Sequence, residues 1–236
     1  MPGFRDDGRL DRGSPVRVDQ LTQFLPKLVF WFVPVLLSLT VHEWAHAASA
    51  NALGDGTARR MGRLTLNPIA HMDPLGTVLL PLMQIALSGT VMFAWAKPVP
   101  VNPANFTRRV SMRKGDVLVS AAGPAANLAI ALFAAVSIGL SARFGMEPGA
   151  FLALMQALFG LNIALAVFNL LPVPPLDGSH VLRGVLPTRA AMAYERVFPY
   201  APFLLMAVFV FGGGLIRLPM GVIHGWLGKL AMLIAG

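Results

Sequence analysis

The chain has 236 residues, of which 56% are hydrophobic and 13% are charged, and its mean hydropathy is +0.65. Because this apolar content exceeds what a soluble domain of the same size needs for its core, the composition predicts an integral membrane protein and argues against a soluble one. The formal net charge of +8 does not indicate a nucleic-acid partner, because the cations cluster in segments that flank apolar runs and so report topology.

Residues 1–20 form a polar segment without apolar periodicity, which we expect to be a short tail. The apolar segments that follow are separated by short polar stretches, and no internal repeat is evident. They lie at 28–53, 75–95, 116–142, 151–171, 197–214 and, more weakly, 218–235. The pattern predicts an all-α polytopic membrane protein with a single domain at 21–236 and about five transmembrane helices, with a short sixth as an alternative.

The first apolar segment contains the sequence HEWAH at residues 42–46. Ionisable residues are costly in a membrane and usually serve a function there. On a helix, His42 and His46 project from one face, so both imidazoles can reach one metal ion while Glu43 stands beside it as a candidate general base. The alternatives are interfacial histidines with a glutamate that reaches toward water, and a signal peptide that ends near the small residues 48–50. The long, acid-containing segment before it and the charged pentapeptide argue against the signal peptide.

Segment 75–95 could just span a ~30 Å bilayer, but its sequence favours a segment that enters the membrane and returns. Pro81 interrupts it, residues 88–90 break it, and residues 91–101 end in the extended sequence Lys-Pro-Val-Pro-Val. Basic residues flank it on both sides: Arg59, Arg60, Arg63, Lys97, Arg108, Arg109, Arg113 and Lys114. Since the positive-inside rule assigns both loops to the cytoplasm, we predict a re-entrant helix and strand at 75–101, between the first and second full spans.

This arrangement fixes the direction of the later segments. With the amino terminus outside, segment 116–142 runs outward, segment 151–171 returns, and the basic loop that follows is again cytoplasmic. Counted along a helix from Leu28, His42 lies roughly 9 Å from the cytoplasmic face of a ~30 Å apolar core. The sequence therefore predicts a site near the cytoplasmic face.

A catalytic zinc ion takes three protein ligands and keeps one position open, so the two histidines leave one ligand unassigned. The chain has no cysteine, which leaves imidazole and carboxylate as candidates. Asp177 follows a proline run that must end helix 151–171 near the cytoplasmic face. Had 75–95 crossed fully, Asp177 would emerge some 20 Å from the histidines, so the re-entrant segment and the three-ligand site support each other. Taken alone, the Asp-Gly pair is also typical of a turn.

Three motifs now occur in one order: HEWAH at 42–46, GPAAN at 123–127, and NLLPVPPLDG at 169–178. Together they resemble the site-2 proteases, a family of intramembrane zinc metalloproteases. Segments 62–74 and 95–103 are similar to the compact bacterial branch of that family, and the resemblance spans about residues 28–185. The chain departs from other members in lacking a helix before HEWAH and in showing no PDZ or CBS regulatory domain.

The resemblance implies one zinc ion per chain, with His42, His46 and Asp177 as ligands and Glu43 as general base, in agreement with the spacing argument. It also implies that Asn169 holds the substrate backbone, although a carboxamide at this position could instead satisfy a helix end. An extended element within 91–101 would pair with the substrate.

We therefore expect a multi-pass protease of the bacterial cytoplasmic membrane. Its substrates would be transmembrane proteins, hydrolysed within or near their membrane segments. One alternative is an ion- or proton-coupled transporter, for which internal repeats or paired broken helices would be expected. The other is a catalytically silent homologue that binds membrane proteins, which would be expected to have lost a ligand or the base.

Three further polar residues have open roles. His71 and Asp73 could hold a second metal or orient a ligating histidine, but the nearby Asn-Pro and Asp-Pro pairs favour a shaped polar loop. His180 could line the site or cap a helix at 179–186.

Overall fold

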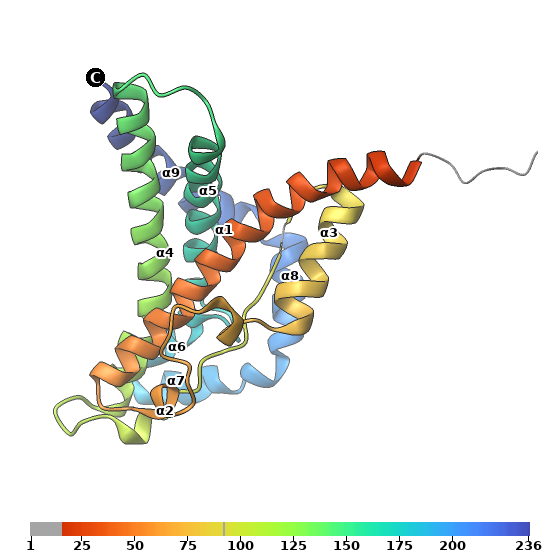
Figure 1. Ribbon diagram of the computed structural model, residues 1–236. Helices are drawn as coiled ribbons and strands as arrows, with labels where there is room; N and C mark the ends of the chain where they lie inside the picture. The colour runs from red at the N-terminus through yellow and green to blue at the C-terminus, as the bar shows by residue number, and fades with distance from the viewer. Residues whose placement is uncertain (1–15, 92) are drawn as a thin grey trace, which may run out of the picture.

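The computed structural model describes residues 16–91 and 93–236 (Figure 1). Within these ranges the regular structure is helical and contains no β-strand. The α-helices are α1 (Val16–Ala52), α2 (Thr57–Arg60), α3 (Leu80–Ser88), α4 (Met112–Arg143), α5 (Ala150–Asn169), α6 (Asp177–Val185), α7 (Thr188–Glu195), α8 (Ala201–Phe211) and α9 (Gly213–Ala235). Shorter helical turns lie at Pro68–Ala70, Pro74–Leu79, Pro103–Asn105 and Phe198–Tyr200.

Five helices of the described chain are long and apolar enough to cross a membrane, by length and composition. They are Phe24–Ala52, Met112–Arg143, Ala150–Asn169, Thr188–Phe211 and Gly213–Ala235. This confirms the predicted all-α polytopic fold, and segment 75–95 forms instead a shorter apolar helix at Pro74–Ser88. The predicted tail falls largely on residues 1–15, which lie outside the described residues, and α1 already begins at Val16.

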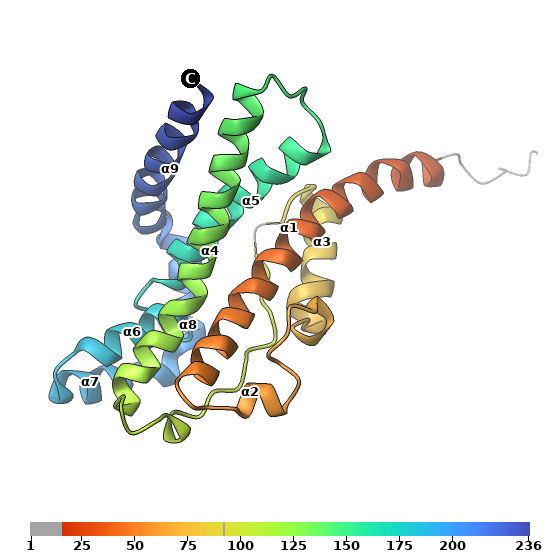
Figure 2. The same cartoon turned by 60° about the vertical axis from the view of Figure 1, so that its left-hand side comes forward.

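Helix α4 is the central element of the bundle. It packs against α1, α5, α6 and α9, and Figures 1 and 2 show it upright among them. The contact surfaces carry small side chains, among them Ala47, Ala50, Ala131, Ala134 and Ala135, none of which has exposed surface. Small residues let membrane helices approach closely enough to associate through van der Waals contact. Because α1, α5 and α6 all pack against α4, residues from these three helices lie close to one another beside it.

The chain between α2 and α4 starts near the C-terminal end of α1, runs alongside α1 toward its N-terminal half, and then returns. Helix α3 lies next to the first half of α1, and the extended segment that follows it descends again (Figures 1 and 2). Trp95 N–H donates to Gly76 O at 3.2 Å, and Thr77 Oγ1 donates to Trp95 O at 2.6 Å. The predicted extended element is therefore present, but it is bonded to a helix and to side chains rather than to a second strand.

Gly76 lets the indole of Trp95 pack directly on the backbone of the preceding turn. A Cβ atom at this position would lie 2.2 Å from the indole ring, so the two could not keep their present contact. A larger residue at position 76 would force the indole to turn away or the extended segment to move off Pro74–Leu79.

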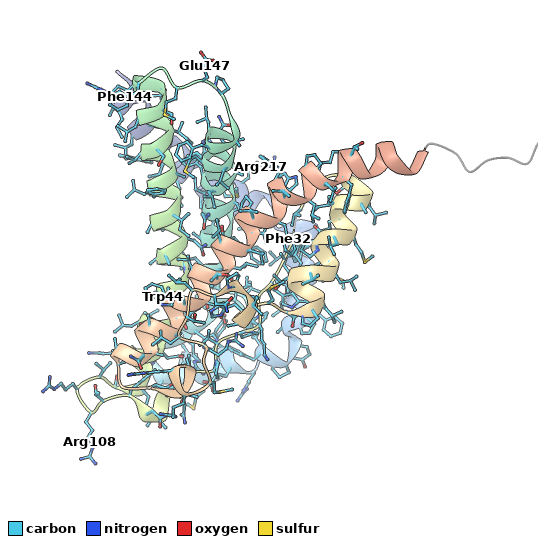
Figure 3. All side chains as sticks on the ribbon, viewed as in Figure 1. Phe32, Trp44, Arg108, Phe144, Glu147 and Arg217 are labelled. Atoms are coloured by element: carbon cyan, nitrogen blue, oxygen red, sulfur yellow. The ribbon has the colours of Figure 1, made fainter. Side chains whose placement is uncertain are left out.

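Most of the exposed basic residues of the described loops lie at one end of the molecule. Arg108 lies at the end where α1 stops, and Phe144 and Glu147 lie at the opposite end (Figure 3). The exposed Arg59 and Arg60 of α2 belong to the same end as Arg108. From there α8 rises, and α9 continues to the far end, where the carboxyl terminus lies (Figure 1).

Candidate active site

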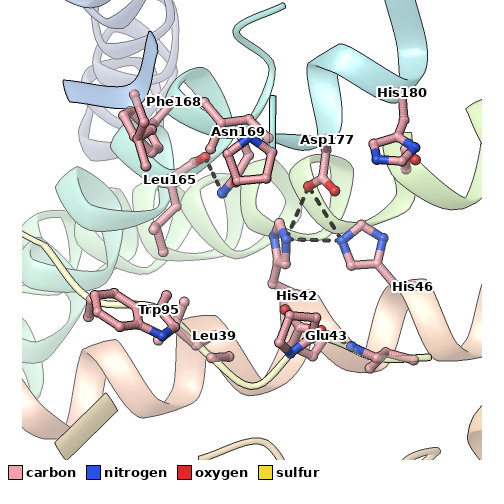
Figure 4. A pocket seen from close by; sticks show the side chains of 18 of the residues that line it. Leu39, His42, Glu43, His46, Trp95, Leu165, Phe168, Asn169, Asp177 and His180 are labelled. Carbon is pink, nitrogen blue, oxygen red and sulfur yellow. Dashed lines mark hydrogen bonds and ion pairs between the residues drawn. The ribbon is translucent and has the colours of Figure 1, made fainter. Parts of the chain in front are cut away.

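Two histidines of α1 and one aspartate of α6 meet beside α4 (Figure 4). His42 Nε2 lies 3.0 Å from His46 Nε2, and these two atoms lie 3.2 and 3.4 Å from Asp177 Oδ2. One ligand-type atom from each of the three residues falls within 4.8 Å of the other two. The helical spacing of the histidines and the proline-terminated end of α5 thus bring together the three residues that the sequence analysis selected.

The opposite nitrogen of each imidazole is held by α4. His46 Nδ1 donates to Val119 O at 2.7 Å, and His42 Nδ1 lies 2.6 Å from Asn127 Oδ1. A carbonyl oxygen can only accept, so the hydrogen of His46 is on Nδ1 and the lone pair of Nε2 faces the other two residues. Such an outer hydrogen bond is typical of histidines that bind a metal.

This donor set fits a zinc ion. Two imidazole nitrogens and one carboxylate oxygen are the ligands of many catalytic zinc sites. Asp177 Oδ2 is buried without a hydrogen-bond partner among the described residues, and a buried anion left in this state is costly. A cation at the centre of the three residues would satisfy that oxygen and the lone pair of His46 Nε2.

Gly123 explains part of the GPAAN motif. A Cβ atom on this residue would lie 2.4 Å from His46 Nε2 and 2.6 Å from His42 Cε1, so only glycine lets α4 approach the two imidazoles. One turn later, Asn127 reaches His42. In the sequence this motif served only as a mark of resemblance, and both roles were missed. Asn127 lies four residues after Gly123, a spacing that places it on the same face of α4.

Glu43 extends from the same helix toward the extended segment. Its Oε2 accepts a hydrogen bond from Val99 N at 2.9 Å. Pro98 and Pro100 have no N–H group, so Val99 offers the one amide hydrogen in this stretch of the chain. The candidate base and the predicted substrate-pairing element are therefore in direct contact.

A cavity of about 950 Å³ opens at the three residues. It is walled by apolar side chains of α1, α5 and α8 and by the extended segment between Val91 and Val101. Such a volume accommodates several residues of a peptide. Asn169 lines it, but its Nδ2 donates to Leu165 O at 3.0 Å, as in the helix-end alternative, so its role toward substrate stays a prediction.

His180 lines the same cavity rather than capping a helix, since α6 begins at Asp177. Its Nδ1 lies 3.3 Å from Asp116 Oδ2, which also pairs with the guanidinium of Arg183 at 2.5 Å. The sequence analysis missed Asp116, because a single acid at the start of an apolar helix is more often a solvated residue. The Asp116–Arg183 pair ties α6 to α4 and so helps to place Asp177.

His71 and Asp73 shape a loop. His71 is buried and its Nε2 donates to Thr65 O at 2.8 Å, while Asp73 accepts from the backbone N–H groups of Leu75 and Gly76. Within residues 16–91 and 93–236 no second group of metal-binding side chains is found. The geometry favours the polar loop over a second metal site.

Arg63, interpreted above as a marker of topology, is buried with 7% of its surface exposed. Its guanidinium donates to Lys97 O and lies 3.4 Å from Pro98 O. It therefore holds the extended segment next to Glu43. A charge count along the sequence does not distinguish such a residue from its exposed neighbours Arg59 and Arg60.

Comparison with known proteins agrees with this geometry. The family model described as Peptidase family M50 matches residues 145–212. Over 191 residues the chain is 40% identical to the Bacillus subtilis protein named "Putative zinc metalloprotease YwhC", an alignment that covers 78% of this chain and 81% of that protein. The chain belongs to the site-2 protease family.

Two mycobacterial proteins, each named "Putative zinc metalloprotease Rip2", are also similar to this site-2 protease. The identity is 36% over 144 residues with Rip2 of Mycolicibacterium smegmatis, covering 61% of this chain and 52% of that one. It is 32% over 175 residues with Rip2 of Mycobacterium tuberculosis, covering 74% and 64%. No solved structure matches the chain. The family assigns this multi-pass membrane protein to the zinc metalloproteases, whose substrates are peptides.

Proposed function

We propose that this site-2 protease is an intramembrane endopeptidase that cuts transmembrane proteins near the cytoplasmic face of the bacterial cell membrane. His42, His46 and Asp177 would bind one zinc ion, and Glu43 would be the general base. The observation that carries the proposal is the convergence of three ligand atoms within 4.8 Å, in a largely apolar cavity that Glu43 also lines.

The charge distribution supports a cytoplasmic location. The exposed Arg59, Arg60 and Arg108 lie at the end of the molecule where α1 stops, whereas the other end carries one arginine, Arg143, together with Glu147 in the loop between α4 and α5. His46 is six residues before the end of α1 at Ala52, which corresponds to about 9 Å along the helix. By the positive-inside rule the site is then on the cytoplasmic side of the bilayer.

The chemistry needs few groups. Zinc, when bound, polarises the peptide carbonyl and lowers the pKa of a coordinated water toward ~7. Glu43 accepts a proton from the attacking water as the C–O bond forms, and it then delivers this proton to the amine nitrogen, which leaves as the C–N bond breaks. The hydrogen bond from Val99 N fixes one oxygen of the Glu43 carboxylate and leaves the other to carry the proton.

The extended segment supports binding of the substrate as an added strand. Alternate residues bond to the protein through their backbone: Phe93, Trp95, Lys97 and Val99. In an extended chain the intervening residues direct their N–H and C=O groups to the opposite edge. Among the described residues, Ala94 and Ala96 have no such partner. A substrate helix must unwind to expose its peptide bonds, and this edge offers replacement hydrogen bonds.

Purified enzyme in lipid vesicles with a fluorescent transmembrane peptide tests the proposal. The peptide carries Gly-Pro in its cytoplasmic half, which weakens its helix. Wild type should cut it there, while Glu43→Gln should keep the fold and the zinc ion but lose activity by several orders of magnitude. Cleavage by Glu43→Gln at the wild-type rate would remove Glu43 as the base. Absence of any cleavage by zinc-loaded wild type would favour the silent homologue.

A further inference from the structure

A series of buried, hydrogen-bonded polar side chains connects His42 to residues of three helices. His42 of α1 meets Asn127 of α4, Asn127 Nδ2 donates to Asn162 Oδ1 of α5 at 2.7 Å, and Asn162 Nδ2 donates to Ser38 Oγ of α1 at 2.9 Å. Asn127, Asn162 and Ser38 have no exposed surface. Nothing in the proposed chemistry requires Asn162 or Ser38, yet burying several amide and hydroxyl groups in a membrane protein is costly unless all are satisfied.

The backbone carbonyl of Leu158 determines which atom donates and which accepts in each hydrogen bond between Asn162, Asn127 and His42. Asn162 Nδ2 also donates to Leu158 O at 2.9 Å, and a carbonyl can only accept. If the Asn162 amide were flipped, its own oxygen would face Leu158 O and repel it. The Nδ2 group is therefore at the Leu158 end, and Oδ1 faces Asn127.

The orientation of the Asn162 amide determines, through Asn127, where the hydrogen of His42 lies. Because Asn162 presents an oxygen, Asn127 must present its Nδ2 to it, which turns Asn127 Oδ1 toward His42. That oxygen can only accept, so the hydrogen of His42 is on Nδ1. The lone pair of His42 Nε2 then points at His46 and Asp177. The other tautomer would place a hydrogen where the metal ion is to bind.

We propose that Asn127 and Asn162 are positioning residues that fix the tautomer of His42, and thereby raise the affinity of the site for zinc. The inference rests on the proposed metal site. The tautomers of the two histidines are fixed in different ways. That of His46 is fixed by the backbone oxygen of Val119, which no substitution removes, and that of His42 is fixed by the side chains of Asn127 and Asn162. His46 is therefore an internal reference for any change at His42.

A purely structural role is the competing explanation, because polar side chains also join helices in membranes. Ser38 separates the two explanations. It accepts from Asn162 and donates to Pro34 O at 2.7 Å, but Leu158 O fixes the Asn162 amide without it. Ser38→Ala should lower the thermal stability and leave both the tautomer and the zinc affinity unchanged.

The test measures the zinc dissociation constant by chelator competition, and the His42 tautomer in metal-free protein by the ¹⁵N chemical shifts of labelled histidine. Asn127→Leu should weaken zinc binding by about 10- to 100-fold, and Asn162→Leu by about 10-fold, as losses of outer hydrogen bonds to ligating histidines do. Both variants should show the Nε2–H tautomer at His42, while His46 keeps its hydrogen on Nδ1.

Two results would overturn the inference. One is an Asn162→Leu variant that keeps both the wild-type zinc affinity and the Nδ1–H tautomer at His42. The other is a Ser38→Ala variant that loses zinc as strongly as Asn162→Leu, since a purely structural role of the buried polar side chains would then account for the effect. If Asn127→Leu does not fold, Asn162→Leu, which does not touch His42, decides alone. A wild-type protein that binds no zinc contradicts the proposed function instead, and the tautomer measurement still tests the relay.

Discussion

At the scale of single residues, the site depends on positions where nothing larger fits. Gly123 is the clearest, because a methyl group there would overlap the two imidazoles. Asn127, Asp177 and the two histidines are placed by helix ends and helix faces, but Gly123 sets how closely α4 approaches them. The GPAAN motif is thus a packing requirement of the site as well as a family resemblance.

Gly123→Ala should reduce zinc binding by at least about 10-fold, since the added Cβ displaces the ligating side chains. Gly160→Ala of α5 is the control, because a Cβ at Gly160 meets no atom within 4 Å. Zinc titration of the two variants in detergent measures the effect. Equal affinities would mean that α4 shifts to accept the methyl group.

Asp55 fixes the turn after α1. It is fully buried and accepts hydrogen bonds from Thr57, Asn102 and Asn105. Burial alone would raise the pKa of its carboxyl, but the bonds from Asn105, Thr57 and Asn102 outweigh it and lower the pKa below the usual 3.8. The charged form is thus favoured by folding. Its contribution to stability is complete above pH 3.8 and is lost as the pH falls through the lower folded-state value.

Asp55→Ala should reduce the free energy of unfolding by about 2–3 kcal/mol, because the N–H groups of Asn102 and Thr57 lose their acceptor. Thermal unfolding of the detergent-solubilised protein between pH 3 and pH 7 measures this. Wild type should lose part of its advantage over the variant toward pH 3. A difference that stays constant with pH would show that the Asp55 charge does not stabilise the fold.

At the scale of elements, the extended segment 93–101 joins the proposed substrate edge to the proposed base Glu43. Arg63 holds its Lys97 carbonyl, and Val99 holds Glu43. The position and extended form of this segment could be predicted from the proline pattern of the sequence. The Arg63 contact was not, because it joins residues that are 34 positions apart and no local pattern distinguishes a buried arginine.

Arg63→Met should release the extended segment and weaken peptide binding while leaving the three proposed zinc ligands in place. We expect KM for the transmembrane peptide to rise about 10-fold and the zinc content to stay at the wild-type level. The exposed Arg59→Met is the matched control and should behave like wild type. Loss of zinc in Arg63→Met would mean that the segment supports the metal site itself.

The limits of sequence analysis are visible in the same elements. The helical period alone brought His42 and His46 together, and the proline run predicted where α5 ends and hence where Asp177 emerges. Asn162, by contrast, reaches the site through Asn127, 35 residues away, in an apolar helix with no motif around it. Contacts of this kind depend on how α4 and α5 rotate against each other, which small buried residues decide.

At the scale of the whole molecule, the re-entrant segment determines whether the site can form. With residues 75–101 returning to their starting side, α5 ends beside the last turns of α1, and Asp177 meets the histidines. If this segment crossed the membrane instead, α4 and α5 would run in the opposite directions through the bilayer, and Asp177 would emerge on the side away from the histidines. The orientation of the whole bundle relative to the membrane is thus tied to one interrupted apolar stretch.

Single cysteines test this topology directly, because the natural chain has none. Arg60→Cys and Arg109→Cys should react with a membrane-impermeant thiol reagent from the same side of the membrane, and Glu147→Cys from the other. Labelling of intact cells and of inverted vesicles distinguishes the two sides. Labelling of positions 60 and 109 from opposite sides would contradict the re-entrant arrangement.

The zinc content of the purified protein tests the central claim most directly. Elemental analysis should find about one zinc ion per chain in wild type and in Glu43→Gln, and less than about a tenth of that in His46→Ala and Asp177→Ala, because a site that loses one of three ligands no longer retains the ion through purification. Metal content that is unchanged in Asp177→Ala would contradict a site formed by His42, His46 and Asp177.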